Sequence, residues 1–133
     1  MSRYCLDTSA YSHFKRGHPP VVELIDQASW VGLPSIVVGE LWVGFLRGNR
    51  IERNRRDLTE FLAHPVVEEL PVDREIGEIY AEIVVALRKA GTPVPSNDIW
   101  IAAAAARAGA TVLTYDPHFS AIERARSLVL PAP

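Results

Sequence analysis

Short apolar runs, typical of buried strands, alternate along this chain with segments whose apolar residues recur at helical spacing. The expected strands cover residues 3–7, 30–33, 66–72, 111–115 and 127–130. The expected helices begin at residue 8, cover 21–28, 36–47, 50–63, 73–89 and 97–107, and include a short one opening at 116–117. The first and fourth strands are continuously apolar, as in strands covered on both faces. This alternation predicts an α/β fold with a mainly parallel sheet.

Length and composition limit what such a fold can do. The 133 residues, 48% of them apolar, are enough for one domain with its own core, which we expect to span 1–133. A net charge of −2 excludes binding to nucleic acid through bulk positive charge, although a local basic patch is still allowed. The lone Cys5 cannot form an internal disulfide, and no apolar stretch is long enough to span a bilayer. We therefore expect a cytoplasmic protein without a membrane anchor.

Four acidic residues stand where an acid needs an explanation. Asp7 and Asp116 each follow an apolar strand, Asp98 precedes the uniformly apolar segment 99–106, and Glu40 interrupts an apolar helix. Each aspartate has a simple alternative role as a helix cap, because Asp is a favoured N-cap residue. Glu40 lies too deep in its helix to cap it, so its alternative is a position on a solvent-facing stripe.

The predicted topology brings these four acids together. Parallel strands end at one edge of the sheet, so Asp7 and Asp116 share that edge, and the helices that begin near Ser35 and Asp98 point their N-termini toward it. Two carboxylates about 4 Å apart repel by roughly 4 kcal/mol at an effective dielectric constant of about 20, so the cluster needs shared protons or a cation. A set of oxygen ligands suits Mg²⁺ or Mn²⁺ better than zinc.

Three hydroxyl-bearing residues flank the expected cluster. Thr8 and Ser9 follow Asp7 directly, and Thr114 lies two residues before Asp116. Hydroxyls in such positions orient metal ligands or bound water. We expect these three residues to support the site rather than to hold an ion.

Four stretches, in this order, resemble the PIN domain and, within it, the VapC-type toxins of bacterial toxin–antitoxin pairs. The stretches are Leu6-Asp7-Thr8-Ser9, Val38-Gly39-Glu40-Leu41, Pro95 to Ala103, and Leu113 to Phe119. The resemblance implies a three-layer α/β/α sandwich and a Mg²⁺- or Mn²⁺-dependent endoribonuclease. It also implies a homodimer and a cognate VapB-like antitoxin that covers or enters the acidic groove.

The resemblance assigns the acidic pocket to Asp7, Glu40, Asp98 and Asp116. We expect Asp7 and Asp98 to be the principal metal ligands, and Glu40 to be a ligand or to orient the attacking water. Asp116, the position that varies most in the family, is expected to hold a second metal or to support the first. The alternative is a catalytically silent PIN-like module that binds RNA or a protein, although four intact acids argue against it.

A basic block gives this acidic chain a possible contact to RNA. Five arginines and one acid lie in 47–56, whereas 68–82 holds six acids and one arginine. We expect Arg47, Arg50 and Arg53 to contact RNA phosphates, because the guanidinium fork binds phosphate bidentately. The alternative is a solvated helix face with charge pairs such as Arg56 with Glu60.

Two further residues have other expected roles. His118, beside Asp116, is interpreted as a structural or rim contact. Trp42 is the candidate for a dimer or antitoxin surface.

Overall fold

The protein is built around one five-stranded parallel sheet. The computed structural model describes residues 2–133. The strands are β1 (Arg3–Leu6), β2 (Trp30–Pro34), β3 (Val67–Leu70), β4 (Thr111–Thr114) and β5 (Ser127–Val129). Their order is β3-β2-β1-β4-β5, and every neighbouring pair is parallel. The expected α/β fold with a parallel sheet is confirmed.

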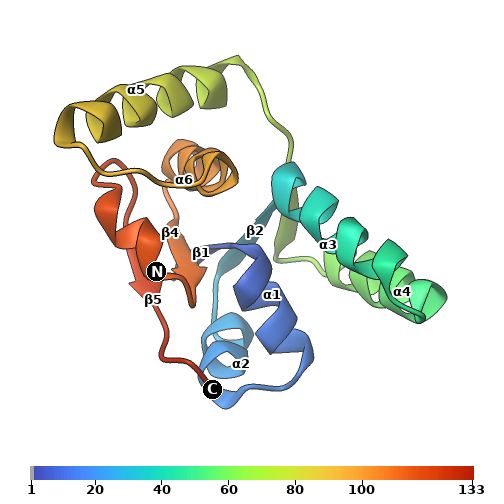
Figure 1. Cartoon of the computed structure of the whole chain (residues 1–133). Coiled ribbons are helices and arrows are strands. Elements are labelled where there is room, and N and C mark those ends of the chain that lie inside the picture. Colours follow the sequence, from blue (N-terminus) through green and yellow to red (C-terminus); the bar gives the residue numbers. More distant parts are fainter. Residues whose placement is uncertain (1) are drawn as a thin grey trace.

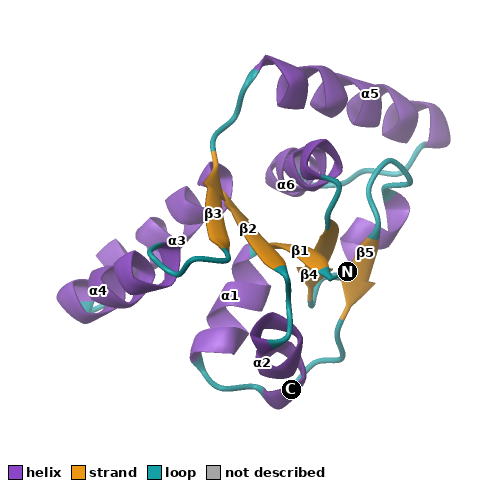
Figure 2. Cartoon of the chain, turned by 180° about the vertical axis from the view of Figure 1, so that it is seen from behind, coloured by secondary structure: helices purple, strands orange, loops and turns teal. Residues whose placement is uncertain are grey.

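Helices cover both faces of this sheet. They are α1 (Thr8–Lys15), α2 (Pro19–Asp26), α3 (Ser35–Arg47), α4 (Ile51–Leu62), α5 (Arg74–Ala90) and α6 (Ser96–Ala108), with a 3₁₀ helix η1 (Pro117–Ala121). Helices α5 and α6 lie on one face and α1 and α2 on the other, while α3 and α4 project as a pair from the β3 side (Figures 1 and 2). This is the expected three-layer sandwich.

A run of alanines seats α6 on the sheet. Ala102, Ala103 and Ala105 are completely buried, and α6 contacts β1, β2 and β4. Small side chains let the helix axis approach the strands closely, so that Leu6 and Leu113 of the central strands are also completely buried. The close approach fixes the N-terminal end of α6, which carries Asp98, above the carboxyl end of the sheet.

Several element ends differ from the sequence-based expectation. Helix α2 begins at Pro19 instead of residue 21, because proline fits the first turn of a helix, where its missing N–H is not needed. Asp7 caps α1, which is the alternative role that its residue type allowed. Strand β3 is shorter than 66–72 and ends just before Pro71. Gly109 ends α6 at a φ of +64°, a conformation that glycine adopts without strain.

None of the helices between residues 2 and 133 combines the length and the hydrophobicity needed to cross a bilayer.

Candidate active site

The site lies where β1 and β4 end side by side. Leu6 pairs with Leu113, so Asp7 and Thr114 follow as neighbours at the carboxyl edge. The Asp7 N–H donates to the Leu113 carbonyl across 3.3 Å, and the Thr114 hydroxyl donates to Oδ2 of Asp7. Thr114 is completely buried and Asp7 is 5% exposed. The sheet register therefore holds one carboxylate at a fixed point.

The Asp7 carboxylate has two structural functions at once. Its Oδ1 accepts a hydrogen bond of 2.8 Å from the backbone N–H of Ala10, which caps α1, and another of 2.8 Å from the Ser9 hydroxyl. The Ser9 oxygen in turn accepts from the backbone N–H of Tyr115 across 3.1 Å. Asp7 therefore caps α1 and also belongs to the acidic cluster.

Glu40 is held between two helices. The Thr8 hydroxyl donates to its Oε1, and the Asn97 side-chain amide donates to its Oε2 across 3.2 Å. Glu40 is half-buried on α3 and does not lie on a free solvent-facing stripe. Both of its oxygens therefore point toward the N-terminal ends of α1 and α6.

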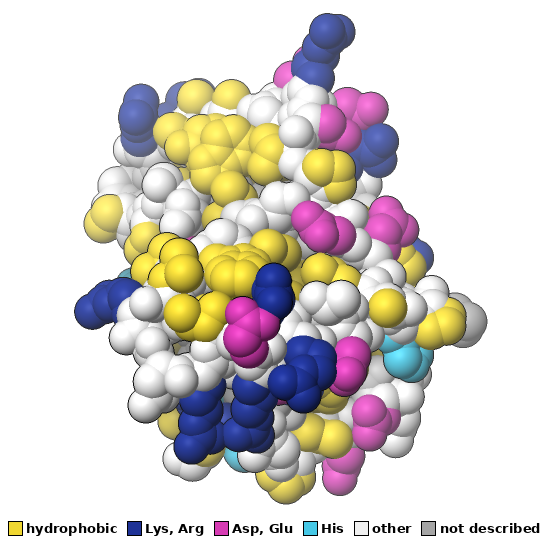
Figure 3. Space-filling view, turned by 90° about the vertical axis from the view of Figure 1, so that its right-hand side faces the viewer, with side chains coloured by type: hydrophobic (Ala, Val, Ile, Leu, Met, Phe, Trp, Pro, Cys, Tyr) yellow, Lys and Arg dark blue, Asp and Glu magenta, His cyan; other side chains and the backbone are white. Residues whose placement is uncertain are grey.

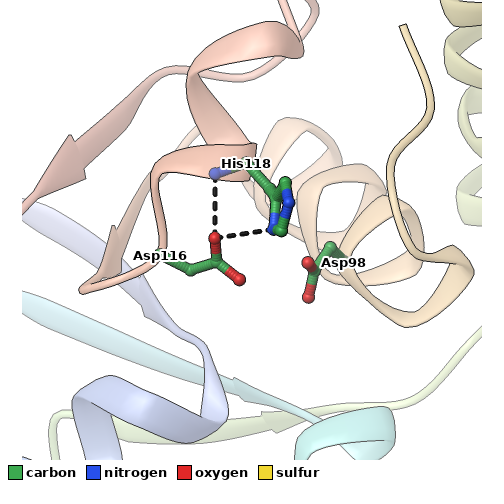
Figure 4. A group of neighbouring side chains, drawn as sticks. All are labelled: Asp98, Asp116 and His118. Carbon is green, nitrogen blue, oxygen red and sulfur yellow. Dashed lines mark hydrogen bonds and ion pairs between the residues drawn. The ribbon is translucent and has the colours of Figure 1, made fainter.

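Asp98 and Asp116 face each other across the mouth of the site, and His118 lies beside them (Figure 4). The ligand atoms of these three residues lie within 4.8 Å of one another. His118 Nδ1 is 2.8 Å from Asp116 Oδ1, which also accepts from the His118 backbone N–H and so caps η1. Asp98 does not cap α6, because the N-cap position is Pro95. Asp7 and Glu40 lie outside this closest group.

The four carboxylates nevertheless form one electrostatic cluster. The pKa of Asp98 is raised to about 6, chiefly by burial and then by the negative charges of Asp116, Asp7 and Glu40, against the opposing effect of His118. Burial also raises the pKa of Asp7, against the effect of its hydrogen bonds, and Asp116 adds to the rise. Burial and neighbouring negative charges both disfavour the ionised form of these carboxyl groups, and a bound cation would stabilise that form.

The three hydroxyl residues that were expected to support the site contact its carboxylates, and Asn97 and His118 join them. Thr8, Ser9 and Thr114 each donate a hydrogen bond to a carboxylate of the cluster. Asn97 was overlooked as the partner of Glu40, although its position directly before Asp98 was a usable signal. His118, interpreted as a structural or rim contact, belongs to the closest group of potential ligands.

The predicted RNA-contacting arginines are divided between two places. Arg50 and Arg53 line a pocket between α1, α3 and α4, whereas Arg47 is exposed at the end of α3, outside that pocket. The anticipated pair of Arg56 with Glu60 is not found within residues 2–133; the ion pair present on α4 joins Arg55 to Glu52.

Comparisons with known proteins match this architecture over nearly the whole chain. A family model described as PIN domain matches residues 4–125. Ribonuclease VapC5 of Mycobacterium tuberculosis is 31% identical over 123 residues, which are 92% of this chain and 90% of that protein. Ribonuclease VapC4 of the same organism is 35% identical over 91 residues, or 68% of this chain and 70% of that protein.

Solved structures agree with the sequence relatives. A DNA-bound VapBC complex from Salmonella typhimurium contains a chain that matches with a TM-score of 0.85 at 26% identity, covering 96% of this chain and 98% of that one. VapBC-5 from Mycobacterium tuberculosis matches with a TM-score of 0.71 at 26% identity, over 99% and 100% of the two chains. The shared fold, the extent of the family match and the two relatives above 30% identity place this chain in the PIN-domain family and, within it, among the VapC ribonucleases.

Proposed function

We propose that residues 1–133 form a single nuclease domain that hydrolyses RNA phosphodiester bonds with Mg²⁺ or Mn²⁺, as the toxin of a VapBC-type pair. The convergence of acidic side chains carries the proposal: the ligand atoms of Asp98, Asp116 and His118 lie within 4.8 Å of one another, and Asp7 and Glu40 are near enough to raise the pKa of Asp98. Carboxylates are gathered in this way, at a cost in repulsion, where a hard divalent cation is bound.

The donor set fits such an ion. Asp98 and Asp116, with Asp7 beside them, would hold it, and oxygen ligands suit Mg²⁺ and Mn²⁺. When bound, the ion lowers the pKa of a coordinated water and stabilises the negative charge that develops on the phosphate.

The remaining side chains orient the attacking water and the metal-binding carboxylates, and one of them accepts a proton. Glu40, held by Thr8 and Asn97, orients the attacking water and accepts its proton at Oε1 or Oε2. Thr114 and Ser9 fix the orientation of the Asp7 carboxylate. His118 holds Asp116 through its Nδ1 and its backbone N–H.

Arg47, Arg50 and Arg53 are proposed to contact the RNA backbone. All three are exposed, and none forms an ion pair within the described part of the chain, residues 2–133. Guanidinium groups free of internal partners are available to bind phosphate oxygens.

The proposed partners are a VapB-like antitoxin and a second copy of the chain. The antitoxin is supported by the solved toxin–antitoxin complexes that share this fold. For the dimer, α3 exposes Val43 and Leu46 (55% and 65% exposed) next to the half-buried Trp42. An apolar strip of this kind is typical of a surface that a partner covers. A cytoplasmic location agrees with the unpaired, buried Cys5.

A cleavage assay tests the proposed activity. The protein is incubated with a structured RNA and Mn²⁺, alone and with EDTA, and Asp7→Asn is compared with Asp26→Asn, which changes an exposed aspartate of α2. We expect cleavage by the wild type and by Asp26→Asn, and none with EDTA or by Asp7→Asn. Cleavage that persists both in EDTA and in the Asp7→Asn variant contradicts the proposal. Tight RNA binding without cleavage identifies a catalytically silent module instead.

A further inference from the structure

A polar pocket lies between α1, α3 and the start of α4. Its volume is about 350 Å³. The lining comprises Tyr11, Ser12, Lys15 and Arg16 from α1, Leu41 and Phe45 from α3, and Arg50, Arg53, Asn54 and Asp57 from the α4 segment. None of these is among the residues described above as part of the acidic cluster.

The charge of this pocket is strongly positive and uncompensated. Lys15, Arg16, Arg50 and Arg53 face one acid, Asp57, which leaves a net charge of +3. Within residues 2–133, none of the four cations forms an ion pair or a side-chain hydrogen bond to the protein. Figure 3, which views the side where α3 and α4 project, shows Lys and Arg side chains gathered below an apolar patch. Cations left unpaired around a hollow favour an anionic ligand.

Neutral donors and a helix end complete the pocket. Asn54 and Ser12 supply an amide and a hydroxyl. Burial and the neighbouring Asp57 raise the pKa of Tyr11 to about 12, so its phenol keeps its proton at neutral pH. Helix α4 begins here with Arg50 at its N-cap position and no side chain that caps it. An uncapped N-terminus attracts anions through its free N–H groups and the helix dipole.

The pocket lies within reach of an RNA strand held at the acidic cluster. Helix α1 connects the two places, because Thr8 at its start contacts Glu40, and Lys15 at its end lines the pocket. Seven residues of helix correspond to a rise of about 10 Å, on the order of three stacked nucleotides of one strand.

We propose that this pocket binds a backbone phosphate of the RNA substrate, a few nucleotides away from the bond that is cut. The inference rests on the proposed ribonuclease function. It adds Lys15 and Arg16 to Arg50 and Arg53 as residues that contact RNA phosphate. Arginine forks grip phosphate bidentately, and the lysine adds a point charge. The pocket sets where the strand lies and takes no part in the chemical step.

An RNA-binding assay in EDTA tests this assignment. Fluorescence anisotropy measures the binding of a labelled, mixed-sequence single-stranded RNA over a range of salt concentrations. The pocket pair Arg50→Gln/Arg53→Gln is compared with the control pair Arg55→Gln/Arg56→Gln, which removes the same charge from the same helix outside the pocket. A third variant, Lys15→Gln/Arg16→Gln, tests the α1 side. Unchanged melting temperatures verify that the exposed substitutions leave the fold intact.

We expect both pocket pairs to bind RNA about tenfold more weakly at low salt, because hydrogen bonds to charged groups are lost. The slope of log K against log salt becomes shallower by about 0.7, which corresponds to the loss of one single-strand phosphate contact. The control pair stays within about twofold of the wild type, as expected for solvent-screened charges. In Mn²⁺, the pocket pairs raise KM and leave kcat unchanged.

Equal binding by pocket and control pairs overturns the phosphate site, and the proposed function still stands if the wild type cleaves RNA. A wild type that neither binds nor cleaves RNA overturns both. If the pocket pairs lose affinity for poly-L-glutamate but not for RNA, the pocket serves an acidic protein segment and the assignment is wrong.

Discussion

Asn97 donates a hydrogen bond of 3.2 Å to Oε2 of Glu40, and this contact joins the first turn of α6 to the middle of α3. The two residues are 57 positions apart in the chain. With Thr8 on the other oxygen, the Glu40 carboxylate has a fixed orientation toward the cluster. The site thus depends on helix packing as well as on the sheet.

Replacing Asn97 by alanine removes the hydrogen bond to Oε2 of Glu40. We expect Asn97→Ala to lower kcat for RNA cleavage by about 10- to 100-fold, the usual cost of losing an outer hydrogen bond at such a site, with little change in KM. Steady-state kinetics on a defined RNA measure the effect. The control is Ser96→Ala, one residue earlier on the exposed start of α6, which we expect to behave as the wild type. Equal kcat values for the two variants argue against a positioning function of Asn97.

Thr114 couples the sheet to the site. Its hydroxyl donates to Asp7 and accepts a hydrogen bond of 2.8 Å from the backbone N–H of Asp116. Thr114→Val keeps the shape but leaves both partners unsatisfied, so we expect a loss of about 1–3 kcal/mol in the free energy of unfolding, together with weaker cleavage. Urea denaturation measures the first effect. Thr111→Val on the same strand is the matched control, and a comparable loss there contradicts the explanation.

The raised pKa of Asp98 makes a prediction about pH. In the folded protein without metal this pKa is about 6, against an ordinary value of 3.8, so the folded state binds the proton more tightly than the unfolded chain. The contribution of Asp98 to the free energy of unfolding is therefore greatest below about pH 4. It decreases as the pH rises from about 4 to 6 and stays low above that range.

Asp98→Asn removes this titration. We expect the variant to be more stable than the wild type at pH 7 in EDTA, on the order of 1 kcal/mol after allowance for solvent screening of a half-buried group. The gain shrinks on acidification and vanishes below about pH 4. Thermal unfolding in EDTA at several pH values tests this, with Asp26→Asn as the control. A gain that does not vary with pH contradicts the electrostatic explanation.

A stability prediction independent of the site concerns the cap of α5. Asp73 Oδ1 accepts a hydrogen bond of 2.9 Å from the backbone N–H of Ile76. We expect Asp73→Ala to lower the free energy of unfolding by about 1 kcal/mol and to leave RNA cleavage unchanged. The exposed Glu78→Ala on the same helix provides the comparison in urea titrations. A larger loss with Glu78→Ala means that the cap is not what stabilises this end.

Much of this architecture was predictable because it depends on local patterns. The continuous apolar strands and their order along the chain indicated a parallel sheet, and a parallel sheet brings Asp7 and Asp116 to one edge. Glu40 and Asp98 stood out because each interrupts or precedes an apolar segment. The family resemblance then assigned the four acids to one pocket.

What the sequence did not indicate depends on how helices pack against one another. Asn97 reaches Glu40 only because the alanine face of α6 lies close to the sheet, and no local pattern specifies that distance. In the same way, Lys15 and Arg16 join Arg50 and Arg53 only through the contacts of α1 with α3 and of α3 with α4. Asp7 proved to be both a cap and part of the cluster because one carboxylate has enough lone pairs for both.

The central claim is that acids from four parts of the chain create one site for a hard divalent ion. An anomalous difference map from crystals soaked in Mn²⁺ tests it most directly. We predict a peak coordinated by carboxylate oxygens of Asp98 and Asp116, with Asp7 and Glu40 around it, and no peak there in crystals of Asp98→Asn. Absence of a peak at these carboxylates in the wild type, or an equal peak in the variant, contradicts the claim.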